Sequence, residues 1–155
     1  MKRDSRLSGV LHVLLHMAES NGPVTSEQLA KAMRTNPVVI RRIMAGLRDR
    51  DLVRSEKGHG GGWTITRDLS SVTLRDVYEA LGSPEIFAMG HRTEAPGCLV
   101  EQAVNSAMDD SFTRAETLLL DRFGEVTLAA LHADLQARLS RRESLCDFKG
   151  ASDAA

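Results

Sequence analysis

Apolar side chains recur along this chain at the spacing of a helix in several separate segments. Between residues 37 and 49 they fall three or four positions apart, which buries one side of a helix. Its stripe is Ile40, Ile43, Met44 and Leu47. The same spacing predicts a short helix after Thr25 and longer ones over residues 5–20, 74–81, 98–123 and 128–139. The pattern therefore predicts a mainly α fold (α+β) with few strands.

Local chemistry indicates where the helices begin and end. Asn36 is a favourable N-cap, and Pro37 occupies the first helical position, where its missing N–H is not needed. Thr25 and Gln28 have the spacing of a capping box for the preceding helix. Residues 25–49 therefore predict a helix-turn-helix. Gly124 is expected to end the long helix that starts near residue 98.

Two strand-like runs follow the helix-turn-helix, over residues 52–55 and 63–66. The loop between them, residues 57–62, contains four glycines, so its tip can approach another molecule closely. It is not a phosphate-binding P-loop, because no Gly-Lys-Ser/Thr follows the glycines. Helix, turn, helix and hairpin is the order of a winged helix-turn-helix, whose second helix enters the major groove of DNA while the wing reaches the backbone or minor groove.

The predicted DNA contacts lie in the second helix and in the wing. An arginine can donate two hydrogen bonds to guanine, a valine can touch a thymine methyl group, and a helix start favours phosphate. The expected contact residues are Thr35, Asn36, Val38, Val39, Arg41, Arg42, Lys57, Gly58, His59 and Gly60. Two alternatives stay open: the arginines contact phosphate only, or the winged helix is a protein-interaction scaffold.

The charge is divided unevenly along the chain. The whole chain has a net charge of −1. Residues 1–67 hold 12 Lys and Arg against 6 Asp and Glu, a net +6, whereas residues 68–155 hold 8 against 15, a net −7. A basic first half and an acidic second half suit one surface that faces a polyanion and another that is turned away from it.

The recognition-helix and wing residues also carry a resemblance. TNPVVIRRIMAGLRDRDLV followed by KGHGGGW resembles the Rrf-two (Rrf2) family of bacterial repressors, the IscR-, NsrR- and CymR-like proteins. VTLRDVYEALG resembles the helix after the wing in that family, and PGCLVEQAVNSAMDDSF resembles the start of its dimerisation helix. The resemblance covers about residues 5–125 and is closest to the single-cysteine YwnA-like branch.

The resemblance implies a homodimeric repressor that binds an inverted repeat in double-stranded DNA. Together with the helix pattern, it predicts the domain organisation. The expected parts are a winged helix-turn-helix over 1–81, a loop or sensor segment over 82–97, a dimerisation helix and C-terminal helix over 98–143, and a flexible tail over 144–155.

The family often carries a sensory iron–sulfur cluster, and this chain departs from the residues that hold it. In the IscR-like branch three cysteines precede the long helix and a histidine lies in its first turn; here Cys98 is alone and Glu101 has the place of the histidine. Another branch uses a carboxylate and a histidine of the first helix, and this chain has Ser8 and His12 there. Because such clusters need mostly thiolates, no cofactor or metal is expected. A cluster-containing sensor is kept as an alternative function.

Cys98 is the candidate sensor residue. It follows Pro96 and Gly97 at the start of a predicted helix, where the helix dipole favours the thiolate and hence reaction with oxidants. The alternatives are a buried packing cysteine, with the signal coming instead from a small ligand in the 82–97 loop or from neither. Cys146 is expected to be incidental.

Other classes of protein are excluded or disfavoured by motifs that the chain lacks. No run approaches the roughly 18 apolar residues of a membrane span, and His12 and His16 interrupt the apolar N-terminal segment, so a cytoplasmic protein is expected. These two histidines are expected at or near the surface, with metal binding as the alternative. No nucleophile elbow, HExxH or Walker motif is present, and no enzyme activity is expected.

Overall fold

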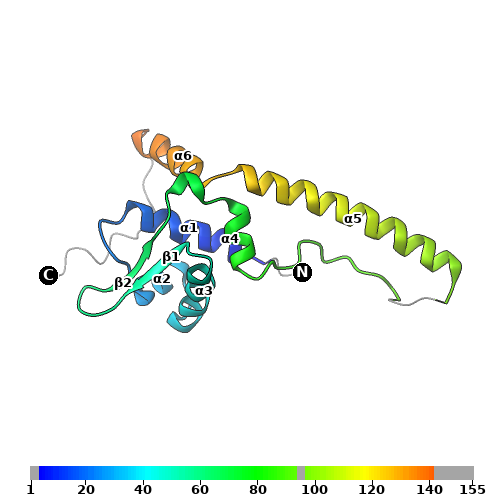
Figure 1. The fold of residues 1–155 in the computed structure, drawn as a ribbon, viewed down its shortest axis with the longest axis horizontal. Helices are drawn as coiled ribbons and strands as arrows, with labels where there is room; N and C mark the ends of the chain where they lie inside the picture. The colour runs from blue at the N-terminus through cyan, green and yellow to red at the C-terminus, as the bar shows by residue number, and fades with distance from the viewer. Residues whose placement is uncertain (1–3, 94–96, 142–155) are drawn as a thin grey trace.

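A winged helix-turn-helix carries a long projecting helix in this computed structural model (Figure 1), which describes residues 4–93 and 97–141. The elements are α1 (Arg6–Glu19), α2 (Ser26–Met33), α3 (Pro37–Asp49), β1 (Val53–Glu56), β2 (Gly62–Ile65), the short 3-10 helix η1 (Leu69–Ser71), α4 (Leu74–Ala80), α5 (Leu99–Glu125) and α6 (Leu128–Ser140). The predicted mainly α winged-helix fold is confirmed. The 3-10 helix was not predicted. The division into functional domains stays a prediction.

The helix-turn-helix begins and turns as its residues predict. Thr25 accepts a hydrogen bond from the Gln28 backbone at 3.2 Å, and the Gln28 side chain accepts one from the Thr25 backbone at 2.8 Å, which completes the capping box. Arg34 adopts a left-handed conformation with a φ of 51° and ends α2. Asn36 then caps α3, accepting a hydrogen bond from the Val38 backbone at 2.8 Å.

The wing is an antiparallel hairpin in which Val53 pairs with Ile65 and Glu56 with Gly62. Its strands lie one residue away from the predicted runs. Val24, just before α2, adds a bridge that was not predicted: its N–H donates to the Trp63 carbonyl at 3.0 Å, and the Trp63 N–H donates back at 2.8 Å. Gly62 permits this close approach, because a Cβ there would lie only 2.7 Å from the Val24 carbonyl oxygen.

Trp63 joins the wing to the helix-turn-helix. Its indole is buried, and its Nε1–H donates a hydrogen bond of 2.9 Å to Oγ of Ser26, the first residue of α2. Ser26 is also buried. A buried indole N–H without an acceptor would lose the hydrogen bonds that water supplies in the unfolded chain, so this contact fixes the wing against α2.

One apolar core holds the winged part together. α1 contributes one side of it and packs against α2, α4, α6 and β2. The fully buried members include Val10, Leu14, Leu29, Ile40, Met44, Leu47, Leu52, Val77 and Leu128. The buried stripe predicted for residues 37–49 is confirmed at three of its four positions, and Ile43 is only partly buried.

The end of α5 differs from the prediction. The helix runs through Gly124 to Glu125, so the expectation that this glycine ends it was wrong. The chain leaves helical geometry at Val126, which is extended. There the Leu74 N–H donates to the Val126 carbonyl at 2.9 Å, and the Leu128 N–H donates to the Val72 carbonyl at 2.8 Å. Pairing with a distant segment ends the helix, and a local sequence signal cannot show that.

The segment after α4 runs out along α5 before the chain turns back into it (Figure 1). The rings of Phe87 and Phe112 stack with centroids 5.4 Å apart, and His91 Nε2 lies 2.7 Å from Asp109 Oδ1. The Asn105 side chain donates to the Thr93 carbonyl at 2.9 Å. The described part of the predicted 82–97 loop is therefore non-helical and is fastened to one side of α5.

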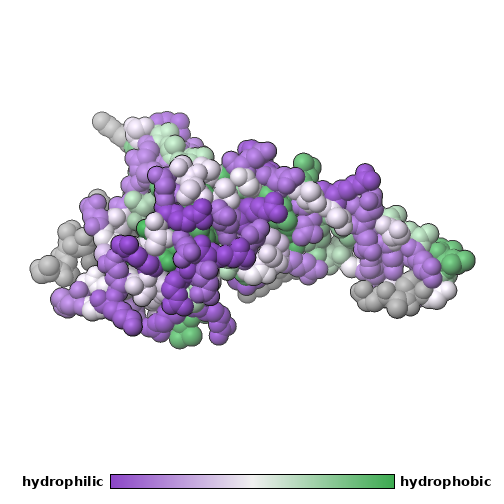
Figure 2. Space-filling view, in the orientation of Figure 1, coloured by the Kyte–Doolittle hydropathy of each residue, from purple (hydrophilic) through white to green (hydrophobic). Residues whose placement is uncertain are grey.

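The other side of α5 has no cover within the described chain. None of its 27 residues is buried. Val104 is 51% exposed and Leu118 is 74% exposed, and Leu99 and Val100 are exposed at its start. Figure 2 shows apolar residues gathered at that far end. Phe112 lies on the covered side, where it contacts Phe87 of its own chain.

The two histidines of α1 differ in environment. His12 is exposed, whereas His16 is buried, deeper than the surface or lightly buried position that was expected. Their Nε2 atoms are 2.9 Å apart and the rings stack. Burial lowers the pKa of His16, the neighbouring His12 lowers it further, and Glu19 opposes both. Glu19 Oε1 also contacts His132 Nε2 and accepts a hydrogen bond from the Gln136 side chain, which connects α1 to α6.

In the described ranges no helix combines the length and apolar character needed to cross a membrane.

Replacing Ser26 by alanine should destabilise the winged part by about 1–3 kcal/mol, because the Trp63 N–H stays buried without its acceptor. The measurement is urea unfolding followed by tryptophan fluorescence, where the midpoint should fall without a change in slope. Ser8→Ala, at an exposed position of α1, is the matched control, and its urea midpoint should equal that of the wild type. Equal midpoints for all three proteins would show that the indole contact does not hold the wing.

Candidate nucleic-acid interface

The outward side of α3 presents a mixed apolar and cationic surface. The inward stripe that contains Ile40 and Met44 fixes the rotation of the helix. Val38 and Val39 therefore face outward near its start, with 56% and 43% of their surface exposed. Arg41 and Arg42 follow them and are exposed as well. Two exposed valines beside two arginines can offer apolar contact to thymine methyl groups and fork-shaped donors to guanine.

The wing tip is exposed throughout the four predicted positions, Lys57, Gly58, His59 and Gly60. Gly58 and Gly60 have φ angles of 96° and 77°, a region that other residues rarely adopt. The Gly61 N–H donates to the Gly58 carbonyl at 3.1 Å and closes a tight turn. Lys57 is thus displayed on a narrow tip, and the backbone of this tip can come close to the sugar-phosphate backbone of DNA.

The two predicted contact regions lie on one side of the winged part. In the view of Figure 1, α3 and the hairpin tip both lie along its lower edge, whereas α5 projects away from it. α3 also packs against β1, which fixes the hairpin relative to the helix. The fold therefore brings the two predicted regions to the same side, although β1 separates them in the sequence.

The polar groups at the start of α3 are partly used within the protein. The Asn36 side-chain oxygen caps α3, and the Thr35 N–H donates to the Ala30 carbonyl at 2.9 Å. For DNA, Asn36 retains its amide NH₂ group and Thr35 its hydroxyl group. Thr35 and Asn36 are both exposed. Their predicted role at the phosphate therefore rests on these remaining groups.

The arginines of this surface differ in their ionic partners. Arg41 Nη2 lies 3.1 Å from Glu27 Oε1 of α2, and Arg54 Nη2 in the wing lies 3.2 Å from Glu56 Oε1. Arg42 and Lys57 make no ion pair within the described part of the chain. The Glu27 contact was not predicted, because it joins two helices and has no local spacing signature.

Cys98 lies at the opposite end of the molecule from this surface. It is the N-cap residue of α5 and is exposed, so Cys98 is not buried by its own chain. Hydrogen bonds from the backbone N–H groups of Glu101 and Val100 lower the pKa of its thiol. Stabilising the thiolate at a helix start is the effect predicted from sequence. The fold does not bring Cys98 to the predicted DNA-contact residues.

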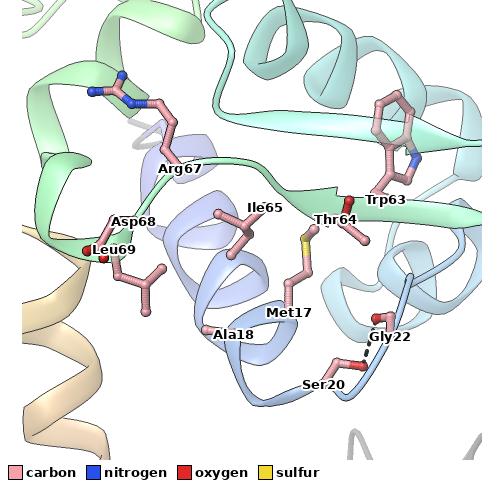
Figure 3. Close-up of a pocket in the computed structure, with 10 residues that line it drawn as sticks. All are labelled: Met17, Ala18, Ser20, Gly22, Trp63, Thr64, Ile65, Arg67, Asp68 and Leu69. Atoms are coloured by element: carbon pink, nitrogen blue, oxygen red, sulfur yellow. Dashed lines mark hydrogen bonds between the residues drawn. The ribbon is translucent and has the colours of Figure 1, made fainter.

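A separate cleft lies behind the wing (Figure 3). It has a volume of about 540 Å³ and is bounded by the end of α1, by β2 and by the connector to η1. Met17, Ile65 and Leu69 supply apolar walls, and Arg67 and Asp68 lie at one side. Because its walls come from three separate segments, no sequence pattern indicated it.

Comparison with known proteins decides the family. The model of the family Rrf2, described as an iron-dependent transcriptional regulator, matches residues 3–134. The chain belongs to the Rrf2 family. This membership was predicted from the recognition-helix and wing residues, and it is confirmed. Rrf2 proteins are transcriptional regulators, a class that is generally not enzymatic.

Two relatives of this Rrf2 chain come from Bacillus subtilis (strain 168), and both are described as HTH-type transcriptional regulators. YwnA is 27% identical over 125 residues, which cover 81% of this chain and 92% of YwnA. YwgB is 28% identical over 138 residues, which cover 81% of this chain and 88% of YwgB. The match to YwnA agrees with the expected single-cysteine branch.

Solved structures share the fold of this Rrf2 chain. IscR of T. potens superposes with a TM-score of 0.63 at 18% identity, over 94% of each chain. CymR, the global cysteine regulator of B. subtilis, gives 0.60 at 19% identity, over 86% of this chain and 98% of CymR. At these identities the likeness concerns the fold alone.

The described part of this Rrf2 chain offers one cysteine toward the iron–sulfur cluster associated with the family. In the described ranges no three His, Cys, Asp or Glu side chains are grouped so that they could hold a metal ion. Cys98 is exposed at the start of α5, and Cys146 lies outside the described residues. A single exposed thiol does not provide the mostly thiolate ligand set that such clusters need.

Proposed function

We propose that this Rrf2-family chain is a homodimeric repressor that binds an inverted repeat in double-stranded DNA. The observation that supports it most is the exposed surface of α3, where Val38 and Val39 lie beside Arg41 and Arg42. Large apolar residues at an exposed helix start contribute nothing to the core of their own domain. Against DNA they contact thymine methyl groups, while the arginines supply donors for guanine and phosphate.

The wing supplies the second contact in this proposal. Its exposed tip carries Lys57 and His59 between glycines, and it reaches the backbone or minor groove beside the groove that α3 enters. A regulator of bacterial chromosomal genes works in the cytoplasm, as the sequence led us to expect. Repression, rather than activation, rests on the resemblance to the family's repressors.

The dimer in this proposal forms through the uncovered side of α5. Val100, Val104, Ala107, Ala115 and Leu118 follow one another at spacings that keep them on one side of a helix. Several are more than half exposed. A twofold partner that lays its own α5 against this side would bury both stripes and present two copies of α3 to successive half-sites.

The signal in this proposal is oxidation of Cys98. Its thiol is exposed, and the start of α5 lowers its pKa, so the reactive thiolate is more populated at neutral pH than in a free cysteine. Oxidation there would change the junction between the 82–97 loop and the dimer helix, and so the spacing of the two winged parts. This proposal involves no iron–sulfur cluster, since Cys98 is the one cysteine that precedes the long helix.

Binding of the wild type to duplex DNA tests the central proposal. A site selected from a random duplex library should be an inverted repeat occupied by two protomers, with half-sites a helical turn or a multiple apart. If each subunit neutralises about four phosphates, log K should fall against log salt with a slope of about −7. A protein-interaction scaffold would show no salt-dependent DNA binding, and a complex with one protomer would contradict the dimer.

Placing a charge in the α5 stripe should separate the subunits. Val104→Glu would bury a carboxylate without a partner, at a cost of several kcal/mol, and should yield monomers by light scattering. Thr113→Glu, at an exposed position on the other side of the helix, introduces the same group and should remain dimeric. A dimeric Val104→Glu protein would place the interface elsewhere.

The sensor role of Cys98 has a test with two readouts. Alkylation of Cys98 should reach half its maximal rate at a pH below the ordinary pKa of cysteine, since the folded protein lowers the thiol pKa. Peroxide should weaken DNA binding by the wild type, and reductant should restore it. Cys98→Ser should bind DNA normally and ignore peroxide, while Cys146→Ser should respond as the wild type does. An equal response of the wild type and Cys98→Ser would move the signal elsewhere, for instance to a ligand of the 82–97 loop.

A further inference from the structure

Glu27 of α2 contacts one of the two arginines that α3 displays. Its Oε1 atom lies 3.1 Å from Nη2 of Arg41, and the two side chains are 65% and 55% exposed. Ion pairs with this exposure add little to folding stability, because water and salt screen them. The contact therefore matters less for folding than for the charge and orientation of the Arg41 side chain when DNA approaches.

The neighbouring cations set a contrast with Arg41. Within the part of the chain that the structure describes, Lys31, Arg34, Arg42 and Lys57 have no acidic side chain within ion-pair distance. They keep their full charge for phosphate. Arg41 is paired with a carboxylate of another helix, whereas Arg48, near the end of α3, lies 3.7 Å from its sequence neighbour Asp49.

A carboxylate beside an arginine affects phosphate and base contacts differently. A phosphate near Arg41 would also lie near the Glu27 anion, which repels it and cancels part of the attraction. A guanine edge offers neutral acceptors and meets less repulsion. The guanidinium has five N–H donors in a planar fork, so a fork with one donor on Glu27 retains donors for a base and loses freedom to rotate.

We propose that Glu27 is a specificity-determining positioning residue, which holds Arg41 for base readout and withholds it from non-specific phosphate contacts. The inference rests on the proposed DNA-binding function and deepens it. Arg42 and the other unpaired cations then supply the sequence-independent affinity, and Arg41 supplies discrimination. Glu27 itself touches no base.

The test compares Glu27→Gln with the wild type on two duplexes, the site selected by the wild type and a random sequence, over a series of salt concentrations. Freed from the carboxylate, Arg41 gains a phosphate contact on random DNA. Each such contact steepens the salt slope by about 0.9 and tightens binding about fivefold at physiological salt, so a dimer should show twice the change in slope. The preference for the selected site should fall by a similar factor or more.

Two further proteins control for charge alone. Asp134→Asn removes one negative charge from an exposed pair with Arg138 on α6, away from α3, and should keep the wild-type slope and preference. Glu27→Gln in an Arg41→Ala background should equal Arg41→Ala alone, because the arginine through which Glu27 acts is gone. Base preference and salt slope are readouts that a merely structural role of an exposed pair would not move.

The outcomes distinguish a failure of the Glu27 proposal from a failure of the proposed DNA-binding function. A wild-type slope and preference for Glu27→Gln would overturn the role of Glu27 while leaving DNA binding intact. The same steepening in the Arg41→Ala background would assign the effect to net charge and also overturn it. A wild type that shows no salt-dependent, sequence-selective binding would refute the proposed function itself.

Discussion

The position of the wing depends on one buried side chain. Trp63 pairs with Val24 through two backbone hydrogen bonds and donates its indole N–H to Ser26, so a single residue of the hairpin is fastened to the entry of α2. Gly62 leaves room for this approach. Since α2 packs against α3, and α3 against β1, the hairpin and the exposed side of α3 are held together by direct packing. The spacing between a helix in one groove and a wing beside it is set before any DNA is present.

Within the described residues, some cations of that surface have acidic partners and others do not, a difference that composition does not show. An excess of six positive charges in residues 1–67 favours attraction to a polyanion. The ion pairs of Arg41 and Arg54 show that part of this charge is balanced locally, whereas Arg42 and Lys57 remain unbalanced. Our proposal for Glu27 assigns attraction and discrimination to different side chains of this surface.

Local signals predicted the fold well, and contacts between distant segments account for the errors. Capping at Thr25 and Asn36 and the stripe through Ile40 depend on neighbours within one or two turns, so the sequence shows them directly. The bridge at Val24 and the continuation of α5 through Gly124 depend on residues far along the chain. The exposure of the predicted DNA-contact residues on α3 follows from the same helix periodicity. The Glu27–Arg41 pair and the cleft behind the wing do not, because several elements must be placed first.

The chain returns to the winged part at Thr127. The segment from Gly82 to Glu125 is therefore a long arm that is closed at its base. Thr73 and Thr127 form a bridge, so the chain leaves the winged part through α4 and comes back beside the point of departure. Everything between Gly82 and Glu125 is attached at this base. Loops closed in this way tolerate changes of length and sequence, because the domain that carries them keeps its own core. The length and sequence of this arm can therefore change while the winged part keeps its own core and its exposed α3 surface.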